Sequence, residues 1–449
     1  MLPQRRDFLK WSAAAAVGAA GTPAAARMQR PRIAAIYTVL RFRSHAYNIL
    51  ENFLKPYLFR GKLVDPGVDV VSLYADQFVD EGDMSRLVSK KFSLPLHKSI
   101  DKALCRGGDD LAVDGVLLIG EHGDYPLNDL GQKMYPRKEF FDQIVAVMKR
   151  SRRYAPIFND KHLSYRWDWA KEMYDETQRH GIPFLAGSSV PLAQRQPALE
   201  LPPGAHIDNA VAVHGGGMET YDFHGLEVLQ SFVEARRGGE AGIATVQFLT
   251  GDGLRETLAA EPWMHRLGRA AMQAELKNPN VRQGFPNRDE KTFRQPLKKL
   301  ITHPEHALLI TYRDGFRAAV LKFGDSSDRW NFACQLRGEK SPRSTALFNG
   351  PWANRCLFKA LSHSIQHLFA HRRAPYPVER TLLVSGVLHA AMRSRINGGE
   401  STRTPELNIP YRPVDFRRFR EDGASWNVIT NKTPQPVPFT PGDAQFLKQ

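Results

Sequence analysis

The chain has few cysteines and no long apolar run, and each shortage excludes a class of protein. Cys105, Cys334 and Cys356 cannot form a disulfide framework in 449 residues, and they lack the paired short spacing of a zinc site. No apolar run reaches the roughly 18 to 20 residues that a membrane helix needs, which excludes an integral membrane protein. What is present, 42% hydrophobic and 24% charged residues, is typical of a folded globular protein of two or three domains.

The first 26 residues have the features of an export signal. Arg5 and Arg6 open a twin-arginine pattern, a weakly apolar stretch follows to Ala20, and the small residues up to Ala26 form a cleavage site. A basic disordered tail is the alternative, but these features come in the order that export requires. We predict a Tat signal cleaved near Ala26 and a periplasmic or secreted protein. Such a protein folds in the cytoplasm before export, in some cases to load a cofactor there.

The net charge of +15 makes the chain basic, and it stays basic without the signal. A basic chain often binds nucleic acid, but this one has no basic helix with interleaved aromatic residues and no zinc-finger spacing. We therefore expect no nucleic-acid partner. For an exported protein, anionic carbohydrate, an envelope polymer or solubility accounts better for the charge.

Apolar strands alternate with helices between the signal and about residue 190. Residues 32–39 form a short, apolar, β-branched run, and Ser44 can cap the amphipathic helix that follows. The other predicted strands are 68–74, 113–120, 155–158 and 182–186, and the other predicted helices are 84–91, 100–104, 140–148 and 167–178. This α/β alternation predicts a Rossmann-like, doubly wound parallel sheet, which we assign to residues 31–200.

The pattern changes beyond the Pro- and Gly-containing linker at 201–204. The predicted strands there are longer, at 205–213, 243–249, 307–312, 316–323 and 331–336, with helices at 221–234 and 355–369. Arg313-Asp314-Gly315 is a hairpin turn signal between two of these strands. We expect residues 201–397 to form an α+β domain with an open, largely antiparallel sheet, and the tail 398–449 to wrap the surface.

Four segments give the chain a resemblance to a known family. They are Ser44-His45-Ala46, Val113 to Ile119, Phe158 to Ser164 with Gly181 to Gly187, and Gly215 to Glu227. Over roughly residues 32–395 they resemble, in order, motifs of the glucose-fructose oxidoreductase, inositol dehydrogenase and MocA (Gfo/Idh/MocA) family. The resemblance implies a Rossmann domain joined to an α+β domain, NAD(P) as cofactor, and sugars or cyclitols as substrates.

The dinucleotide fingerprint of that family is altered here. Its three glycines let the backbone approach the pyrophosphate, and the matching positions hold Tyr37, Val39 and Phe42. Side chains of this size would occupy the space of the diphosphate at the helix N-terminus, which argues against standard NAD(P) binding and leaves the cofactor open. Asp76 stands where the resemblance implies a ribose-binding acid, although a lone Asp after a strand is usually a capping residue.

The resemblance places Lys161 at the family's catalytic lysine, whose amine helps to position and deprotonate a substrate hydroxyl. Asp160 stands in place of the family's Glu, and His162 replaces its Pro and adds a titratable group. A lysine in a cleft can act as an acid or base when burial or a neighbouring cation lowers its pKa. The alternative is that Lys161 pairs with Asp160 and only orders a loop.

A second group of titratable residues surrounds His224, which matches the family's substrate-facing histidine. Glu227, at the position of the downstream acid, lies one helical turn away. His214, Glu219 and Asp222 stand close by in the sequence. A single histidine beside an acid is more often structural than catalytic, but this density favours a site that includes His224 and Glu227.

A third group follows the third predicted strand. Glu121 and His122 stand at the carboxyl end of a parallel strand, where ligands of such folds collect. They could assemble an acid/base pair or a metal site together with His45, Asp160, His162 and His224. The candidate metal ligands are Glu121, His122 and His162, and Asp160 is a candidate catalytic residue. The alternative is a set of polar loop residues that hydrogen-bond locally.

Three functions follow from these patterns. The first is an exported oxidoreductase-like enzyme acting on a sugar or cyclitol, with Lys161 and His224 as acid/base groups. The second is a cofactor-free or metal-assisted carbohydrate lyase, hydratase or hydrolase, and the third is a non-catalytic sugar-binding envelope protein. In each, the expected partner is a small or oligomeric carbohydrate, and a homo-oligomer is expected from the exposed sheet faces of the family.

Overall fold

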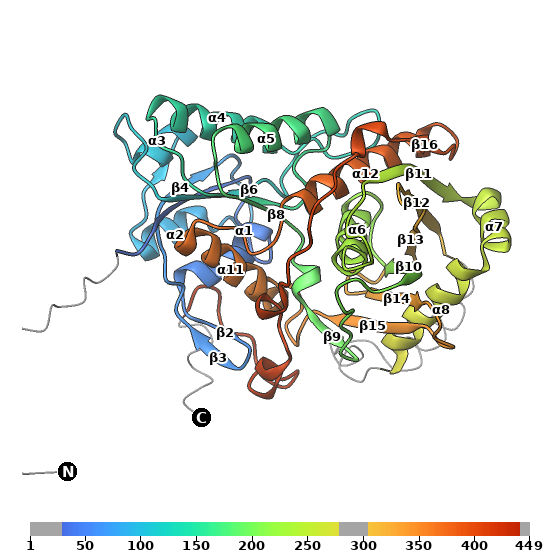
Figure 1. Cartoon of the computed structure of the whole chain (residues 1–449). Coiled ribbons are helices and arrows are strands. Elements are labelled where there is room, and N and C mark those ends of the chain that lie inside the picture. Colours follow the sequence, from blue (N-terminus) through green and yellow to red (C-terminus); the bar gives the residue numbers. More distant parts are fainter. Residues whose placement is uncertain (1–28, 278–303, 441–449) are drawn as a thin grey trace, which may run out of the picture. The chain divides into compact units, whose positions relative to one another are not determined.

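The computed structural model describes residues 29–277 and 304–440 of the chain (Figure 1). The elements below belong to one compact unit, Pro31–Gln449, and the predicted signal at 1–26 lies outside the described residues. This unit contains a six-stranded sheet, an eight-stranded sheet and a small two-stranded sheet of β2 (Tyr57–Phe59) and β3 (Lys62–Val64).

The six-stranded sheet is parallel throughout, with the strand order β5-β4-β1-β6-β7-β8. Its strands are β1 (Arg32–Tyr37), β4 (Asp69–Ala75), β5 (Leu96–His97), β6 (Gly115–Ile119), β7 (Ile157–Asp160) and β8 (Phe184–Gly187). The strand order reverses between β1 and β6. In open α/β sheets, ligands bind beyond the carboxyl ends of the strands at such a reversal.

Helices from both halves of the chain cover this sheet. In Figure 1, α3 (Ile100–Cys105), α4 (Arg137–Arg150) and α5 (Trp167–Arg179) lie along one face, and α1 (His45–Leu54) and α11 (Asn354–His371) along the other; α2 is Ser85–Phe92. The Oγ of Ser44 accepts a hydrogen bond from the N–H of Tyr47, so the predicted N-cap of α1 is confirmed. Phe369 of α11 packs so close to Gly115 of β6 that a Cβ there would lie 2.5 Å from its ring.

The eight-stranded sheet has the order β16-β11-β12-β13-β10-β14-β15-β9, and only its β10–β13 pair is parallel. Its strands are β9 (Gln194–Gln196), β10 (Ile207–His214), β11 (Ile243–Thr250), β12 (His306–Tyr312), β13 (Arg317–Lys322), β14 (Trp330–Leu336), β15 (Arg343–Phe348) and β16 (Thr402–Arg403). The predicted largely antiparallel sheet is therefore confirmed. So is the hairpin at 313–315, which joins β12 to β13.

Apolar side chains bury both faces of this second sheet. α6 (Thr220–Val233) and α12 (Glu379–Ile396) pack on one face, and α8 (Pro262–Lys277), preceded by α7 (Gly251–Ala260), packs on the other. The helix α12 is absent from the sequence prediction. Its side chains are buried around most of its circumference, so its sequence lacks the one-sided periodicity by which a surface helix is recognised.

The two predicted domains share elements in space. β9, from the end of the first predicted domain, forms an edge of the second sheet, whereas α11, from the second, packs against α1. The tail also contributes, since β16 pairs with β11 and Phe439 is buried against Tyr47. Short 3-10 turns occur at Val190–Leu192, Pro405–Leu407, Arg417–Phe419 and Ala424–Asn427.

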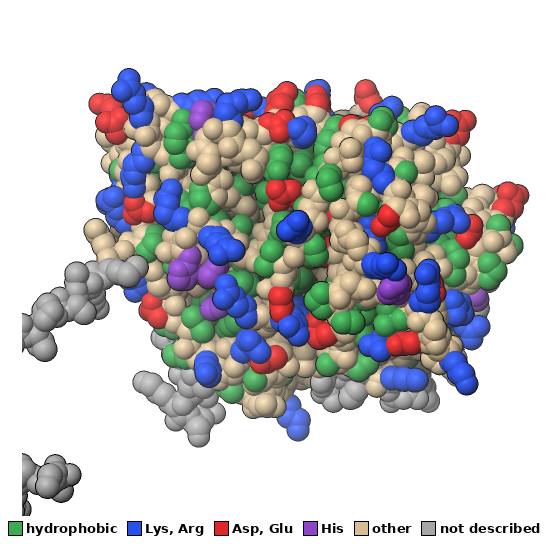
Figure 2. All heavy atoms as spheres, viewed as in Figure 1, with side chains coloured by type: hydrophobic (Ala, Val, Ile, Leu, Met, Phe, Trp, Pro, Cys, Tyr) green, Lys and Arg blue, Asp and Glu red, His purple; other side chains and the backbone are tan. Residues whose placement is uncertain are grey.

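Basic side chains are spread over the face seen in Figure 2, with acidic side chains among them, and they do not gather in one patch. In the part of the chain that the structure describes, no helix is long and apolar enough to cross a membrane.

A buried ion pair joins α1 to α11 and gives a test of this packing. Arg355 donates to both carboxylate oxygens of Glu51, at 2.8 and 2.5 Å, and both residues are buried. Replacing Arg355 with Met leaves a buried carboxylate unpaired, so we expect urea unfolding to show a loss of about 3 to 5 kcal/mol. Lys171→Met, in the half-exposed pair with Asp175, should cost less than about 1 kcal/mol. Equal losses in the two variants would contradict this packing.

Candidate functional site

Loops at the carboxyl ends of β6, β7 and β8 meet the first turns of α1 and α6. They bring together the side chains of His45, Glu121, His122, Asp160, Lys161, His162, Ser188, Glu219 and His224, which we call the charged cluster. Because ligands of doubly wound sheets collect at this edge, the cluster stands where a site is expected. All but His122 are buried.

The centre of the cluster is a carboxylate that carries two cations. Glu121 accepts a hydrogen bond from the Nζ of Lys161 at 2.9 Å on one oxygen, and Arg137 pairs with the other. All three side chains are at least 95% buried. Burial alone would raise the pKa of Glu121, but the positive charges of Lys161 and Arg137 hold it well below its ordinary value, so the carboxylate is ionised.

Asp160 pairs with a histidine and not with its sequence neighbour Lys161. Its Oδ2 lies 2.6 Å from the Nδ1 of His45, at the start of α1, and Arg137 donates from Nε to its main-chain carbonyl at 3.2 Å. The ring of His122 lies 5.1 Å from that of His45. Burial, and then the charge of His45, lowers the pKa of His122 to about 4. The simple loop-ordering pair of Lys161 with Asp160 is therefore absent.

His162 links the two sheets across the cluster. Its ring lies 3.4 Å from Nη1 of Arg137, and its Nε2 lies 3.5 Å from Oε1 of Glu219 at the start of α6. Burial, followed by the charge of Arg137, lowers the pKa of His162. The Nδ1 of His122 is buried without a hydrogen-bond partner, and the Oε1 of Glu219 has no polar contact shorter than its 3.5 Å ion pair with His162. Unpaired polar atoms of this kind are expected where a polar ligand completes a site.

His224, on the second turn of α6, faces Lys161 from the other sheet. Its Nδ1 lies 2.6 Å from the Oγ of Ser188, which also accepts the N–H of Val190 at 3.0 Å. Burial and then the positive charge of Lys161 lower the pKa of His224 well below its ordinary value. The imidazole is therefore neutral at physiological pH.

Glu227 lies one turn beyond His224 and behind the loop that carries Ser188. Its Oε1 accepts the hydroxyl of Thr381 at 2.8 Å, and a Cβ on Gly187 would lie 3.0 Å from its Oε2. Burial raises the pKa of Glu227 to about 7. Glu227 thus supports the turn at Gly187 and Ser188, and it can hold a proton near neutral pH.

Three residues of the cluster have backbone conformations that side chains rarely adopt. The φ angle is +70° at His122, +64° at Lys161 and +64° at Glu219. A positive φ is uncommon outside glycine, and strained backbone of this kind concentrates at functional sites. Each conformation aims a polar side chain at the same buried centre.

The three predicted metal ligands do not converge. Glu121 is held by Lys161 and Arg137, and His162 contacts Arg137 and Glu219. In the described residues, the one group of three or more His, Cys, Asp or Glu side chains with ligand atoms within 4.8 Å of one another is His214, Asp222 and His306.

The His214–Asp222–His306 group is already satisfied without an ion. The Nε2 atoms of His214 and His306 lie 2.9 and 2.7 Å from Oδ1 of Asp222, and Oδ2 accepts the N–H of Glu219 at 2.8 Å. A divalent cation would have to displace the hydrogens of both Nε2 atoms. The group fits a clamp that fixes the first turn of α6, and with it Glu219 and His224, better than it fits a metal centre.

The side chains at the three fingerprint positions differ in how far they are buried. Tyr37 and Val39 are buried in the core beneath the turn, whereas Phe42 is 48% exposed and its ring contacts Tyr47 edge-on. The positive φ in this turn falls on Arg43, not on Val39. Thus Phe42 points outward and does not fill the turn.

Hydrogen bonds join the loops that follow β4 and β6, on either side of β1. Tyr125, in the loop after β6, donates its hydroxyl to Asp76 after β4 at 2.6 Å, and the side-chain amide of Gln77 bonds both the N–H and the C=O of Asp124 at 2.9 Å. The Oγ1 of Thr38 donates to the carbonyl of Glu121 at 2.6 Å. Since β1 lies between β4 and β6, the loop after β6 spans the place where a dinucleotide would lie.

The sequence predicts no role for Arg137, and it places Ser188 only in a loop that lines the cleft. Arg137 is the first residue of α4, directly after Pro136, where a cation is unfavourable beside the positive end of the helix dipole. A buried arginine at this position needs an anion to compensate its charge, and this requirement is the feature of the sequence that could have pointed to its pairing with Glu121. Ser188 follows Gly187, whose φ of +128° marks the sharp turn after β8, but serine in a loop carries no distinctive pattern.

The raised pKa of Glu227 predicts a pH-dependent stability. In the folded protein the buried acid keeps its proton up to about pH 7, whereas in the unfolded chain it loses the proton near pH 4.5. The contribution of this group to the unfolding free energy therefore falls as the pH rises from 4.5 to 7. We expect the unfolding free energy of the wild type, relative to Glu227→Gln, to decrease by roughly 3 kcal/mol from pH 4.5 to 8. A difference that stays constant over this range would contradict the raised pKa.

The comparisons with known proteins concern the signal and the fold. The model of the twin-arginine translocation (TAT) pathway signal sequence matches residues 3–23, so the predicted export signal is confirmed. No curated protein matches the sequence.

The solved structures that resemble this one include those of the following two proteins. GenD2 from gentamicin A biosynthesis, in complex with NAD, has 11% sequence identity over 85% of this chain and 99% of its own, with a TM-score of 0.53. Myo-inositol dehydrogenase from Lactobacillus casei, in complex with NAD(H) and myo-inositol, has 12% identity over 86% of this chain and 100% of its own, with a TM-score of 0.51. The chain therefore has the fold of an inositol dehydrogenase, as the resemblance in its sequence predicts.

Proposed function

We propose that the protein is an exported enzyme that transfers protons on a sugar or cyclitol held at the charged cluster, without a nicotinamide. The substrate class is supported by the fold it shares with the Lactobacillus casei dehydrogenase, whose structure holds myo-inositol. The observation that carries the proposal is the buried Lys161–Glu121–Arg137 group beside a neutral His224. Charged and neutral groups with separated pKa values are typical of acid/base sites.

We propose that NAD(P) does not bind beyond the carboxyl end of β1, where the switch in strand order would otherwise place it. The hydrogen bonds of Tyr125 to Asp76 and of Gln77 to Asp124 tie the loops after β4 and β6 together across β1. Asp76, which a ribose would need as an acceptor, has its two oxygens engaged by the hydroxyls of Tyr74 and Tyr125. We therefore assign no step to hydride transfer.

Lys161 is proposed as the electrostatic partner of the substrate. Its ammonium has three donors, of which one is given to Glu121, so others can point at a substrate oxygen. In a buried site, a fixed cation stabilises negative charge that develops on that oxygen far more than it would in water. The paired Glu121 and Arg137 keep the ammonium in place.

His224 is proposed as the base. With its hydrogen on Nδ1, the ring donates to the Oγ of Ser188, and the Nε2 lone pair is then available to take a proton. A substrate with a carbonyl group would lose the proton from the adjacent carbon to Nε2, while the electron pair moves to the carbonyl oxygen beside Lys161. Return of the proton gives an isomer, and loss of a neighbouring hydroxyl as water gives a dehydrated product. Neither outcome needs a redox cofactor.

A sugar-binding protein without activity is a second candidate. Lys161 and His224 are 3% and 8% exposed, so a ligand has to open the cluster before it can touch either side chain. A protein that only binds has no need of a proton acceptor, and measuring proton exchange separates the two candidates.

The test is exchange of carbon-bound hydrogen in heavy water. We expect the mature protein, folded in the cytoplasm and supplied with aldoses, ketoses, uronates and keto-cyclitols, to incorporate deuterium into at least one of them, as followed by proton NMR. Lys161→Met should lower the rate about 10²- to 10³-fold through loss of oxyanion stabilisation. His224→Gln should lower it about 10²- to 10⁴-fold through loss of the base.

Lys149→Met is the matched control, because Lys149 is an exposed lysine on α4 that pairs with Glu176 and should leave the rate unchanged. Binding of a sugar by the wild type without any exchange would support the second candidate. Stoichiometric nicotinamide released on denaturation, or turnover only with added NAD(P), would refute the proposal.

A further inference from the structure

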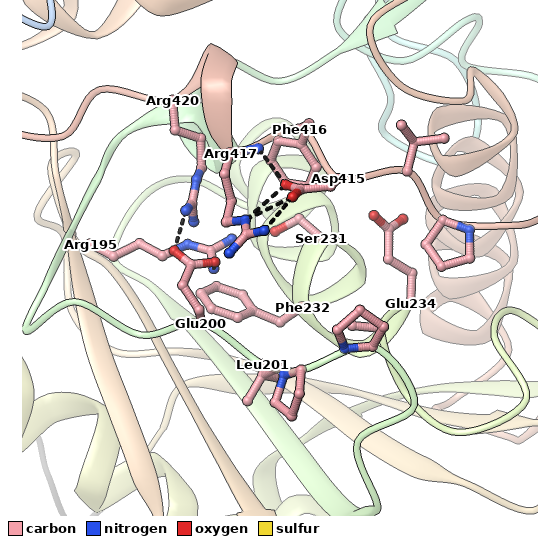
Figure 3. A pocket seen from close by; sticks show the side chains of 15 residues that line it. Arg195, Glu200, Leu201, Ser231, Phe232, Glu234, Asp415, Phe416, Arg417 and Arg420 are labelled. Atoms are coloured by element: carbon pink, nitrogen blue, oxygen red, sulfur yellow. Dashed lines mark hydrogen bonds and ion pairs between the residues drawn. The ribbon is translucent and has the colours of Figure 1, made fainter. Parts of the chain in front are cut away.

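A cavity lies at the C-terminal end of α6, whereas the charged cluster lies near the N-terminal end of the same helix (Figure 3). It has a volume of about 460 Å³, which is in the range of pockets for small organic molecules. Three segments distant in sequence form it: residues 195–203, the last turn of α6, and residues 413–420 of the tail. None of the residues that line this cavity takes part in the proposed function, so the inference below is independent of that function.

Two buried arginines line this cavity. Arg195, on β9, donates from Nη1 to the carbonyl of Leu199 at 2.9 Å and lies 3.4 Å from a carboxylate oxygen of Glu200. Arg420, from the tail, pairs with the other oxygen of Glu200. The side chains of Arg195 and Arg420 are 93% and 91% buried. Figure 3 shows both guanidinium groups beside Glu200.

Three of their nitrogen atoms have no acceptor. Nε of Arg195, and Nε and Nη1 of Arg420, are buried without a hydrogen-bond partner. Leaving a buried charged donor unsatisfied costs more than leaving a neutral one, and such groups in native structures call for a ligand, an ion or a water. Two arginines with free donors side by side match the oxygens of a planar anion.

The charges around the cavity do not balance either. The other acids that line it are committed elsewhere: Asp415 bonds Arg417 with both oxygens, and Glu234 is held by Arg380 at 2.9 and 2.5 Å. Glu200 therefore stands alone against two arginines. Burial, and next the charge of Arg420, lowers the pKa of Arg195, as expected for two cations that share one anion. One negative charge is missing.

Apolar side chains make up a large part of the remaining cavity wall. Its apolar lining includes Leu201, Pro202, Pro203, Phe232, Pro413 and Phe416. The guanidinium of Arg195 stacks over the ring of Phe232 at 3.7 Å, which places the cation at the edge of this wall. An occupant that matches both parts has an anionic head and an apolar body.

We propose that this cavity binds a small organic carboxylate, with the carboxylate between Arg195 and Arg420 and its apolar body against Phe232, Leu201 and Phe416. The ligand supplies the missing negative charge and the acceptors for the unpaired donors. It competes with the side chain of Glu200 for the same two guanidinium groups.

Benzoate is a suitable probe, with benzamide as its neutral counterpart of the same shape. We expect titration calorimetry on the full mature chain to show benzoate binding at least tenfold tighter than benzamide. Glu200→Gln should tighten benzoate binding about tenfold, because it removes the competing carboxylate. Glu200 is 43% exposed, so this variant is expected to fold, and thermal unfolding checks it. A purely structural role for Glu200 would not produce tighter binding.

Arg420→Met should weaken benzoate binding at least tenfold. Arg417→Met is the matched control: Arg417 also lines the cavity, but Asp415 occupies its donors, so binding should change less than twofold. Equal binding of benzoate and benzamide, or no gain from Glu200→Gln, would overturn the proposal. Inorganic phosphate binding as tightly as benzoate would also overturn it, because the apolar wall would then contribute nothing.

Discussion

A single buried carboxylate, Glu121, organises the edge of the parallel sheet where the candidate site lies. It pairs with both Lys161 and Arg137, and removing Glu121 would leave two buried cations without their carboxylate. The pairing fixes the start of the loop after β6. From this anchor the loop crosses β1 and reaches Asp76 through Tyr125. The loop that carries Glu121 of the charged cluster is therefore the same loop that, under the proposed function, lies where a dinucleotide would bind.

The proposed function differs in its chemistry from the dehydrogenase activity that the fold alone suggests. The chain shares its fold with GenD2, whose structure holds NAD, and with a myo-inositol dehydrogenase, whose structure holds NAD(H), yet a fold by itself does not determine which reaction its site performs. Beyond β1, hydrogen bonds of Tyr125 and Gln77 join the loops after β4 and β6. Beyond β7, Lys161 has a strained backbone, and the imidazole of His224 is neutral. This division of groups is the basis on which we propose proton transfer and not hydride transfer.

Most of the fold could be predicted from patterns between residues close in the sequence. The site could be predicted only in part, because its contacts join residues far apart in the sequence. Short apolar runs revealed the strands, and the turn at 313–315 revealed a hairpin, because both signals are local. The sequence identifies Glu121 and Lys161 as separate candidates, but it does not show their pairing, because they lie 40 positions apart. Asp160, the sequence neighbour of Lys161, pairs with His45 instead. The size of Phe42 predicts a side chain that fills the turn after β1. Its ring is instead half-exposed, because the direction of the side chain depends on the backbone conformation, which the sequence does not show.

The account is tested most directly by a crystal structure of the mature protein grown in saturating NAD. We predict that the loop after β6 keeps its place, with the hydroxyl of Tyr125 on Asp76 and Lys161 on Glu121, and that no dinucleotide lies beyond β1. A dinucleotide seated over β1, with Tyr125 displaced from Asp76, would contradict the claim that this pairing closes the crevice.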